Sequence, residues 1–346
     1  MTREELLGRR WAAQGLKPSS PRSPQDTVAA LGAVQAQDRP SALIAIALRG
    51  QGTAPDVQSA LDQGQLVRTH VMRPTWHIVA SSDLRWMMEL TGPRVNQSGA
   101  GRYRQLGLPT EVRTVSRRVI EKALAKGPLG KDELRLALAG AGIPTEGQAL
   151  VHCLMDAELE LVICNGPRRA KESTYDLVDR RIPATPKVSA DEARARLALR
   201  YASGHGPVTD RDFSWWSGLP LTEARRGLEA CGGALTVGTW NDARVWFDPR
   251  EPVATSPFLW LPAFDEYVIA YTDRTAVLSP DENPRAVSSN GIFWPVVLVQ
   301  GVVAGTWSAP VKKGARPVAV DWFTGEPAGG ELARLAWETK LGELTQ

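Results

Sequence analysis

Two stretches of the chain repeat the same order of structural signals, and this repeat constrains the fold more than any other feature. Their Gly-Pro pairs, at 127–128 and 206–207, lie 79 residues apart. Each stretch runs through a helical segment, the Gly-Pro pair, a short acidic helix, a Gly and a further helix, and ends in an apolar strand. The chain is therefore expected to contain consecutive units of one type.

The second copy shows how individual residues delimit these elements. Ser189 and Glu192 form a capping box that opens a helix, which Gly204 is expected to end in the left-handed conformation. Thr209 caps the next, short helix, and Gly218 closes it. Alternating strands, "ALTVGTW" and "RVWFD", then flank "NDA" as a hairpin turn. Three helices followed by a two-stranded hairpin are the winged-helix arrangement.

A third, more divergent copy is expected within residues 23–80, where Ser23 and Pro24 start the first helix. From about residue 255, short β-rich pieces separated by Pro, Gly, Asn and Asp indicate a small antiparallel barrel, in which Gly301 and Gly305 predict a bulge or a tight corner. The expected fold is α+β, with three tandem winged-helix motifs and a C-terminal antiparallel β-barrel closed by a terminal helix. The predicted divisions are 1–110, 111–186, 187–254 and 255–346.

Composition excludes several classes of protein. The chain has 346 residues, of which 43% are hydrophobic and 23% charged, as in soluble globular proteins. It contains no run of about 18 uncharged apolar residues, and its first residues are charged, so we expect no membrane span and a cytoplasmic location. The three cysteines and four histidines lack metal-binding spacing, so no metal and no disulfide framework are expected.

Charge is distributed unevenly along the chain. Residues 1–118 hold 16 Lys and Arg against 9 Asp and Glu, whereas the remaining residues hold 25 against 29. A basic first part indicates contact with a polyanion such as nucleic acid. The alternative is that this asymmetry arises by chance.

Four stretches, in this order, resemble one known family: "LGAVQAQDRPSALIAIALR", "LVRTHVMRPTWHIVA", "LPAFDEYVIAYTDR" and "VVAGTW". They are similar to the AlkZ-like, or YcaQ-like, DNA glycosylases, and the resemblance runs from about residue 3 to the last strands. It implies three tandem winged helices and a β-barrel in a C-shaped scaffold around a DNA channel. It also implies a β-hairpin from the barrel that enters the minor groove near the lesion.

The resemblance further implies an activity. Members of this family excise N-alkylated purines, including bulky N7-alkylguanine adducts and interstrand crosslinks. Their catalytic motif is Gln-x-Gln in one branch, which Gln35 and Gln37 match, and that branch is associated with self-resistance to DNA-alkylating natural products. The implied partner is double-stranded DNA carrying alkylated purines. We expect a monomer, associated with the nucleoid, that uses no cofactor.

Neutral amides are chemically sufficient for such a substrate. An N7-alkylated guanine already carries a positive charge, so it leaves without a proton, and the enzyme has to position a water and favour an oxocarbenium-like transition state. A glutamine carbonyl accepts a hydrogen bond from that water. Because positions i and i+2 of a helix do not face each other, we expect Pro40 to end the first helix within residues 35–39. Asp38 is a possible helper, and an ordinary solvated turn is the alternative.

Candidate DNA contacts come from three basic or polar stretches. In "RTHVMRPTWH" the arginines are expected to hold phosphates, and His77 either contacts the backbone or packs the first wing on its core. "GRYRQLGLPTEVRTVSRR" is a phosphate-tracking strip or a solvated helix face. The polar segment 279–291 is the expected groove-entering hairpin. The predicted DNA-binding residues are Arg39, Arg68, Arg73, His77, Arg102, Arg104, Arg117, Arg118 and Asn290.

Adjacent acids at Asp265 and Glu266 are open to two interpretations. Paired carboxylates are typical of catalytic sites, but a network that braces the barrel against the winged helices, with Arg274 as partner, is the favoured one. The leading hypothesis is a monofunctional DNA glycosylase. The alternatives are a non-enzymatic winged-helix transcriptional regulator and a protein that sequesters lesions without turnover.

Overall fold

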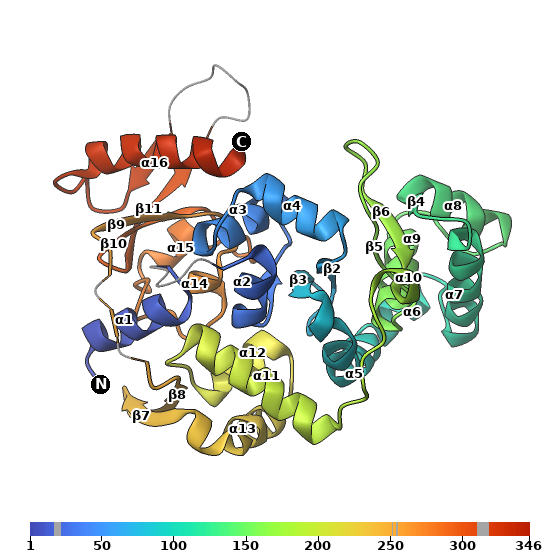
Figure 1. The fold of residues 1–346 in the computed structure, drawn as a ribbon, viewed down its shortest axis with the longest axis horizontal. Coiled ribbons are helices and arrows are strands. Elements are labelled where there is room, and N and C mark those ends of the chain that lie inside the picture. Colours follow the sequence, from blue (N-terminus) through green and yellow to red (C-terminus); the bar gives the residue numbers. More distant parts are fainter. Residues whose placement is uncertain (17–21, 251, 254, 310–317) are drawn as a thin grey trace. The chain divides into compact units, whose positions relative to one another are not determined.

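The computed structural model contains two compact units (Figure 1). One unit is built from both ends of the chain, Met1–Gln58 and Ala195–Gln346, and the other from Ser59–Arg194. The structure describes residues 1–16, 22–250, 252–253, 255–309 and 318–346. The four-part division expected from the sequence remains a prediction.

The N-terminal part of the first unit consists of helices with clear start and stop signals. Helix α2 begins at Pro24 after Ser23, whose side chain accepts a hydrogen bond from the Asp26 N–H, as the sequence predicts. The helix ends at Leu31 because Gly32 follows with φ 83°. The helices here are α1 (Arg3–Ala13), α2 (Pro24–Leu31), α3 (Arg39–Arg49) and α4 (Ala54–Asp62), the last of which continues into the second unit.

A second helical group in this unit follows the predicted pattern with one exception. Thr209 caps α12 in a capping box and Gly218 ends it with φ 71°, as expected. Gly204 does not end α11, which continues to His205; instead, a Cβ at Gly204 would lie 2.6 Å from the carbonyl oxygen of Ala30. Close packing of α11 on α2 therefore requires this glycine. The elements are α11 (Ala190–His205), α12 (Asp210–Ser217), α13 (Leu221–Ala230), the 3-10 turn Gly232–Ala234, β7 (Thr236–Trp240) and β8 (Ala243–Phe247).

The C-terminal strands form an open antiparallel sheet in the order β12-β11-β10-β9. In the described residues β9 and β12 are edge strands that do not pair with each other, so the predicted closed barrel is not confirmed. The predicted bulge is present, because the register between β10 and β11 shifts at Val297/Leu298, opposite Gly305. The elements are β9 (Phe258–Leu261), α14 (Glu266–Ile269), α15 (Asn283–Ala286), β10 (Val296–Val299), β11 (Val302–Ser308), β12 (Ala319–Trp322) and α16 (Gly330–Thr345).

One apolar core joins the two ends of the chain. Leu6 and Trp11 of α1 are fully buried with Tyr267, Val277 and Leu298 from the C-terminal part. Burial of side chains of this size stabilises the fold by about 1.5–3 kcal/mol each. The first unit thus depends on contacts between residues more than 250 positions apart.

The second unit contains the predicted hairpins and helices. Strands β2 and β3 pair antiparallel, and β4, β6 and β5 form a three-stranded sheet in that order. None of the described helices is long and apolar enough to cross a membrane. The elements are β2 (Leu66–His70), β3 (Trp76–Ala80), α5 (Ser81–Ser98), α6 (Ala100–Gln105), α7 (Thr110–Leu124), β4 (Leu129–Gly130), α8 (Lys131–Gly140), α9 (Ala149–Leu159), β5 (Ile163–Asn165), β6 (Thr174–Leu177) and α10 (Val178–Arg181).

Candidate functional site

The Gln-x-Gln motif lies in the connection between α2 and α3, not at the frayed end of a helix. Gln35 is the last residue of the short strand β1 (Val34–Gln35), and Gln37 is exposed two residues later. The expectation that Pro40 ends the first helix is wrong. Pro40 lies in the first turn of α3, where its missing N–H has no helical partner to lose.

Asp38 has a structural role that explains its position. It is the N-cap of α3, and its Oδ1 accepts a hydrogen bond from the Ser41 N–H at 2.8 Å. The side chain is exposed. A part for Asp38 in catalysis remains a prediction, since capping already accounts for an aspartate immediately before this helix.

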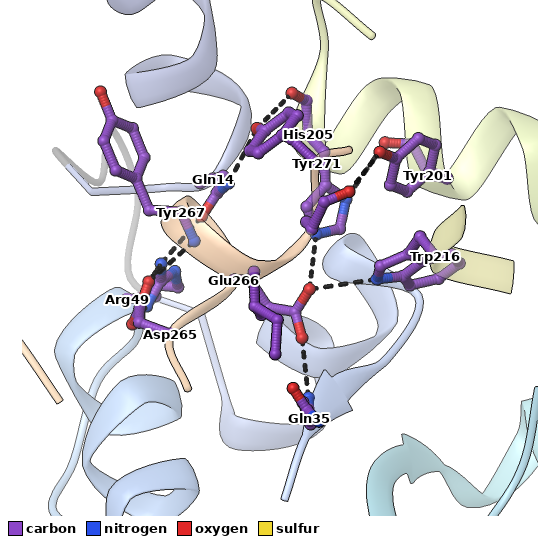
Figure 2. Close-up of polar contacts among 12 residues, drawn as sticks. Gln14, Gln35, Arg49, Tyr201, His205, Trp216, Asp265, Glu266, Tyr267 and Tyr271 are labelled. Carbon is purple, nitrogen blue, oxygen red and sulfur yellow. Dashed lines mark hydrogen bonds and ion pairs between the residues drawn. The ribbon is translucent and has the colours of Figure 1, made fainter. Parts of the chain in front are cut away.

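Gln35 is held through its backbone, while its side-chain oxygen is left unsatisfied. Its N–H donates to Oε1 of Glu266 at 2.7 Å (Figure 2). The residue is 6% exposed, and its side-chain Oε1 is buried without a hydrogen-bond partner among the described residues. A buried acceptor left unpaired costs about 1–3 kcal/mol, so its presence calls for a ligand or water that completes it.

The two adjacent acids of the "FDEY" stretch serve different partners. Glu266 is 2% exposed, and its Oε2 accepts from Nε1 of Trp216 at 3.1 Å and lies 3.3 Å from Nε2 of His205 (Figure 2). Asp265 forms a bidentate ion pair with Arg49, with N···O distances of 2.6 and 2.8 Å. These contacts agree with the interpretation that the two acids form a bracing network, in which Arg49 pairs with Asp265 and His205 lies beside Glu266. Nε of Arg274, the partner expected from the sequence, donates to the carbonyl of Val268 at 3.0 Å.

Further buried polar groups extend this network. Gln14 accepts from Arg49 at 2.9 Å and donates to the hydroxyl of Tyr271 at 3.1 Å, and that hydroxyl donates to the carbonyl of His205 at 2.7 Å. Burial raises the pKa of Tyr271 to about 12 and that of Tyr201 well above its ordinary value. Both phenols are therefore neutral hydrogen-bond donors at physiological pH.

The sequence did not identify most of this network. Arg49, which ends the apolar run "SALIAIALR", is 2% exposed. A charged residue on the apolar face of a helix is a signal that a buried counterion exists, although it does not say which one. His205 and Trp216 carried no such signal, because buried aromatic residues are ordinary core components.

Two of the predicted DNA contacts belong to the same unit as the motif. Arg39 is half-buried and donates to Oε1 of Gln58, which is itself buried. Asn290 is exposed in a tight turn, closed by a hydrogen bond from the Ser288 N–H to the carbonyl of Ile292 at 2.9 Å. This turn lies within the expected hairpin segment, and its contact with DNA remains a prediction.

In the second unit, the first hairpin carries three candidates. The guanidinium of Arg68 lies 4.1 Å from the ring centroid of Trp76, and Arg73 lies in the turn between β2 and β3. His77 is 0% exposed, and its Nδ1 lies 3.0 Å from the carbonyl oxygen of Thr75. Complete burial favours packing of the hairpin over a DNA contact for this histidine.

The basic strip divides into two kinds of arginine. Arg117 donates to Asp156 at 2.7 Å, and Arg113 also pairs with this carboxylate, which is fully buried. These two side chains neutralise an internal charge, so Arg117 is not a simple phosphate contact. Three others are exposed at the surface of α6 and α7: Arg102, Arg104 and Arg118.

Within the part of the chain that the structure describes, no group of three or more His, Cys, Asp or Glu side chains is arranged to hold a metal ion. The polar groups gathered around Gln35 are amides, an indole and a buried histidine–carboxylate pair. Their chemistry fits the positioning of a small polar ligand.

The known proteins to which this chain is similar are DNA glycosylases. Residues 28–341 match the family model described as DNA glycosylase AlkZ-like. An interstrand DNA cross-link repair glycosylase from Streptomyces sahachiroi is 27% identical over 324 residues, which cover 88% of this chain and 86% of that protein. The solved structure of the Streptomyces sahachiroi DNA glycosylase AlkZ superposes with a TM-score of 0.84 at 22% identity, covering 100% of this chain and 98% of that one. This structural similarity shows that the mixed α/β fold is shared.

Proposed function

Because the chain belongs to the family of AlkZ-like DNA glycosylases and is itself a DNA glycosylase, we propose that it hydrolyses the N-glycosidic bond of cationic N-alkylated purines in DNA. Bulky N7-alkylguanine adducts are the proposed substrates. The relative from Streptomyces sahachiroi is named for interstrand crosslink repair, and crosslinked purines are a further proposed substrate for this chain. A biological role in self-resistance to a DNA-alkylating natural product is part of the same proposal.

The proposed chemistry needs little from the protein. A cationic purine departs as a neutral base, so no general acid is required, and the sugar develops oxocarbenium character. The amides of Gln35 and Gln37 would orient a water toward the anomeric carbon. Gln35 ends the strand β1 and Gln37 lies in the bend that follows it, so the helical spacing that would separate the two amides does not apply here. No Schiff-base step is proposed, so the enzyme would be monofunctional.

One observation carries this proposal: the buried side-chain oxygen of Gln35 has no partner among the described residues. When substrate is bound, a water hydrogen-bonded there would satisfy the oxygen and be oriented by it at the same time. Functional sites commonly retain such locally unfavourable groups, because the stability they cost is recovered only when substrate or water is bound.

The scaffold proposed to present this site is the tandem winged helix. In two places a helix is followed by two shorter helices and an antiparallel hairpin, α7 to β6 and α11 to β8. In each case the segment after the first helix pairs with the hairpin, through β4 with β6 and through the Val208–Trp246 bridge with β8. This shared pairing supports a winged-helix motif in each of these two places, and the third motif is proposed for residues 23–80.

Base release from a defined substrate tests the proposal. A duplex oligonucleotide with a single N7-methylguanine is incubated with the protein, and the abasic site is revealed by alkaline strand cleavage. The wild-type protein is expected to release the base, and the Gln35→Ala/Gln37→Ala variant to release none above the spontaneous rate. Affinity for a duplex with a tetrahydrofuran abasic-site analogue should stay within about twofold, because the phosphate contacts that dominate affinity are unchanged. A double variant that releases the base at the wild-type rate would refute the assignment.

A further inference from the structure

We propose that Glu266 is a positioning residue for base release: its buried carboxylate, held by His205 and Trp216, fixes the backbone of Gln35 and thereby the direction of the Gln35 side-chain carbonyl. This inference rests on the proposed role of Gln35 in orienting water. It assigns a function to the one member of the acidic pair that touches the motif (Figure 2).

Two N–H donors face the two oxygens of this side chain. The Gln35 N–H and the Trp216 Nε1–H can only donate, and they approach different oxygens of Glu266, at 2.7 and 3.1 Å. Both oxygens of Glu266 therefore act as acceptors, and the one that binds Gln35 is held in place by the bond that the other makes to Trp216.

His205 completes the set of polar groups around this carboxylate. Its Nδ1 lies 3.2 Å from the carbonyl of Tyr201, which can only accept, so Nδ1 carries a hydrogen. Its Nε2 lies 3.3 Å from Oε2 of Glu266, so one hydrogen lies between the two groups. His205 is 0% exposed and Glu266 2%, and buried polar groups are tolerated when they are hydrogen-bonded to each other in this way.

Trp216 also holds the chain segment that leads from α2 into the motif. A Cβ placed on Gly32 would lie 3.3 Å from the indole carbon Cη2, so the indole is packed against the bend at which α2 ends. The same side chain donates to Glu266. The bend three residues before Gln35 and the carboxylate that binds Gln35 are therefore held by one rigid ring.

Glu266 itself is firmly placed at the start of α14. The preceding residue, Asp265, caps this helix by accepting from the Tyr267 N–H at 2.9 Å, and it is bound on its other side by Arg49. Displacement of a catalytic group by about 1 Å can lower a rate by about 100-fold. A carboxylate anchored in this way limits such displacement of the Gln35 backbone.

Two substitutions of Glu266 separate positioning from simple loss of stability. Glu266→Gln keeps a carbonyl that can accept from the Gln35 N–H, whereas Glu266→Leu has a similar volume and no acceptor. We expect the rate constant for release of N7-methylguanine to fall about 10-fold in the first variant and about 100-fold in the second. Affinity for the tetrahydrofuran-containing duplex should change by less than about twofold in both.

Saturating enzyme makes the measurement independent of the folded fraction. Under single-turnover conditions, with protein in excess over DNA and below the melting temperature of every variant, the rate constant reports the folded molecules alone. Tyr201→Phe is the matched control. It removes a buried hydrogen bond of 2.7 Å to the carbonyl of Ala270 in the same core without removing a bond to Glu266 or Gln35, so its rate constant should stay within about twofold of wild type.

The outcomes distinguish the two proposals. If Gln35→Ala abolishes release while Glu266→Leu retains the wild-type rate constant, the positioning role is refuted and the function of Gln35 stands. If Gln35→Ala retains activity, the proposed function fails first. Equal losses in Tyr201→Phe and Glu266→Leu, or in Glu266→Gln and Glu266→Leu, would also overturn the inference, because the effect would then not follow the acceptor facing Gln35.

Discussion

Replacing Gln35 with leucine should make the protein more stable and inactive. The buried Oε1 of Gln35 has no partner in the described residues, and an unsatisfied acceptor of this kind costs about 1–3 kcal/mol. Leucine fills a similar volume without a polar atom. After subtraction of imperfect packing, we expect the free energy of unfolding to rise by about 1 kcal/mol.

The opposite result is expected for a second buried glutamine. Gln14 is 1% exposed, and its two polar atoms bond Arg49 at 2.9 Å and Tyr271 at 3.1 Å. Gln14→Leu leaves both partners with one hydrogen bond fewer, so the free energy of unfolding should fall by about 1–3 kcal/mol. The same substitution at two buried glutamines should thus change the free energy of unfolding in opposite directions.

Urea unfolding followed by tryptophan fluorescence measures both effects, because the chain has 12 tryptophans. For a unit of 150–250 residues, about 1 kcal/mol corresponds to about 2–4 °C in melting temperature, so thermal unfolding provides a second reading. Base release from the N7-methylguanine duplex should be lost in Gln35→Leu. Destabilisation of Gln35→Leu by as much as Gln14→Leu would show that the Gln35 oxygen is satisfied in the folded protein, and the reasoning would be refuted.

Three other expectations concern a buried ion pair, the arginines of the basic strip and a buried thiol. Arg49→Met should lower the free energy of unfolding by about 3–5 kcal/mol in urea unfolding, and additional replacement Asp265→Leu should recover part of the loss, because an unpaired buried charge is removed. Arg118 is exposed, so Arg118→Ala should reduce the slope of log K for DNA binding against log salt concentration by about one unit, which a salt titration measures. Arg117 pairs with the buried Asp156, so Arg117→Ala should instead lower the free energy of unfolding by about 1–3 kcal/mol, which urea unfolding measures. Burial raises the pKa of Cys164 to about 12, so the folded state keeps the thiol proton that the unfolded chain loses above about pH 9. Stability should therefore decline between these values by up to about 1.4 kcal/mol per pH unit, and Cys164→Ala should remove that part of the decline.

Local signals were sufficient to predict where many elements begin and end. Ser23 and Pro24 start α2, and Thr209 and Gly218 delimit α12, because capping depends on side chains within three residues of the helix end. The strands of the hairpins were also predictable from alternation. Gly204 was misinterpreted because its necessity comes from packing against the carbonyl of Ala30, a contact that has no local sequence signal.

The structure around the motif depended on distant residues and could be predicted only in part. A proline was correctly taken as a helix boundary, but Pro40 begins α3 instead of ending α2, since a proline signals either event. The partners of the acidic pair lie 216 and 231 residues away in sequence. Sequence proximity favoured Arg274, only eight or nine residues from the pair, and could not indicate Arg49 or Gln35.

Consecutive acids explain how the motif is held at both ends. Glu266 binds Gln35, at the end of β1, whereas Asp265 binds Arg49, at the far end of α3. One rigid dipeptide at the start of α14 therefore fixes the residue before the exposed segment 37–38 and the helix after it. Exchanging the order of the two acids would keep composition and charge unchanged while giving each partner a carboxylate on a side chain of the wrong length. Such a variant, Asp265→Glu/Glu266→Asp, should weaken the cap of α14, because glutamate is a poorer N-cap than aspartate. It should also lose base release, because an aspartate at 266 is about 1.5 Å too short for the Gln35 N–H.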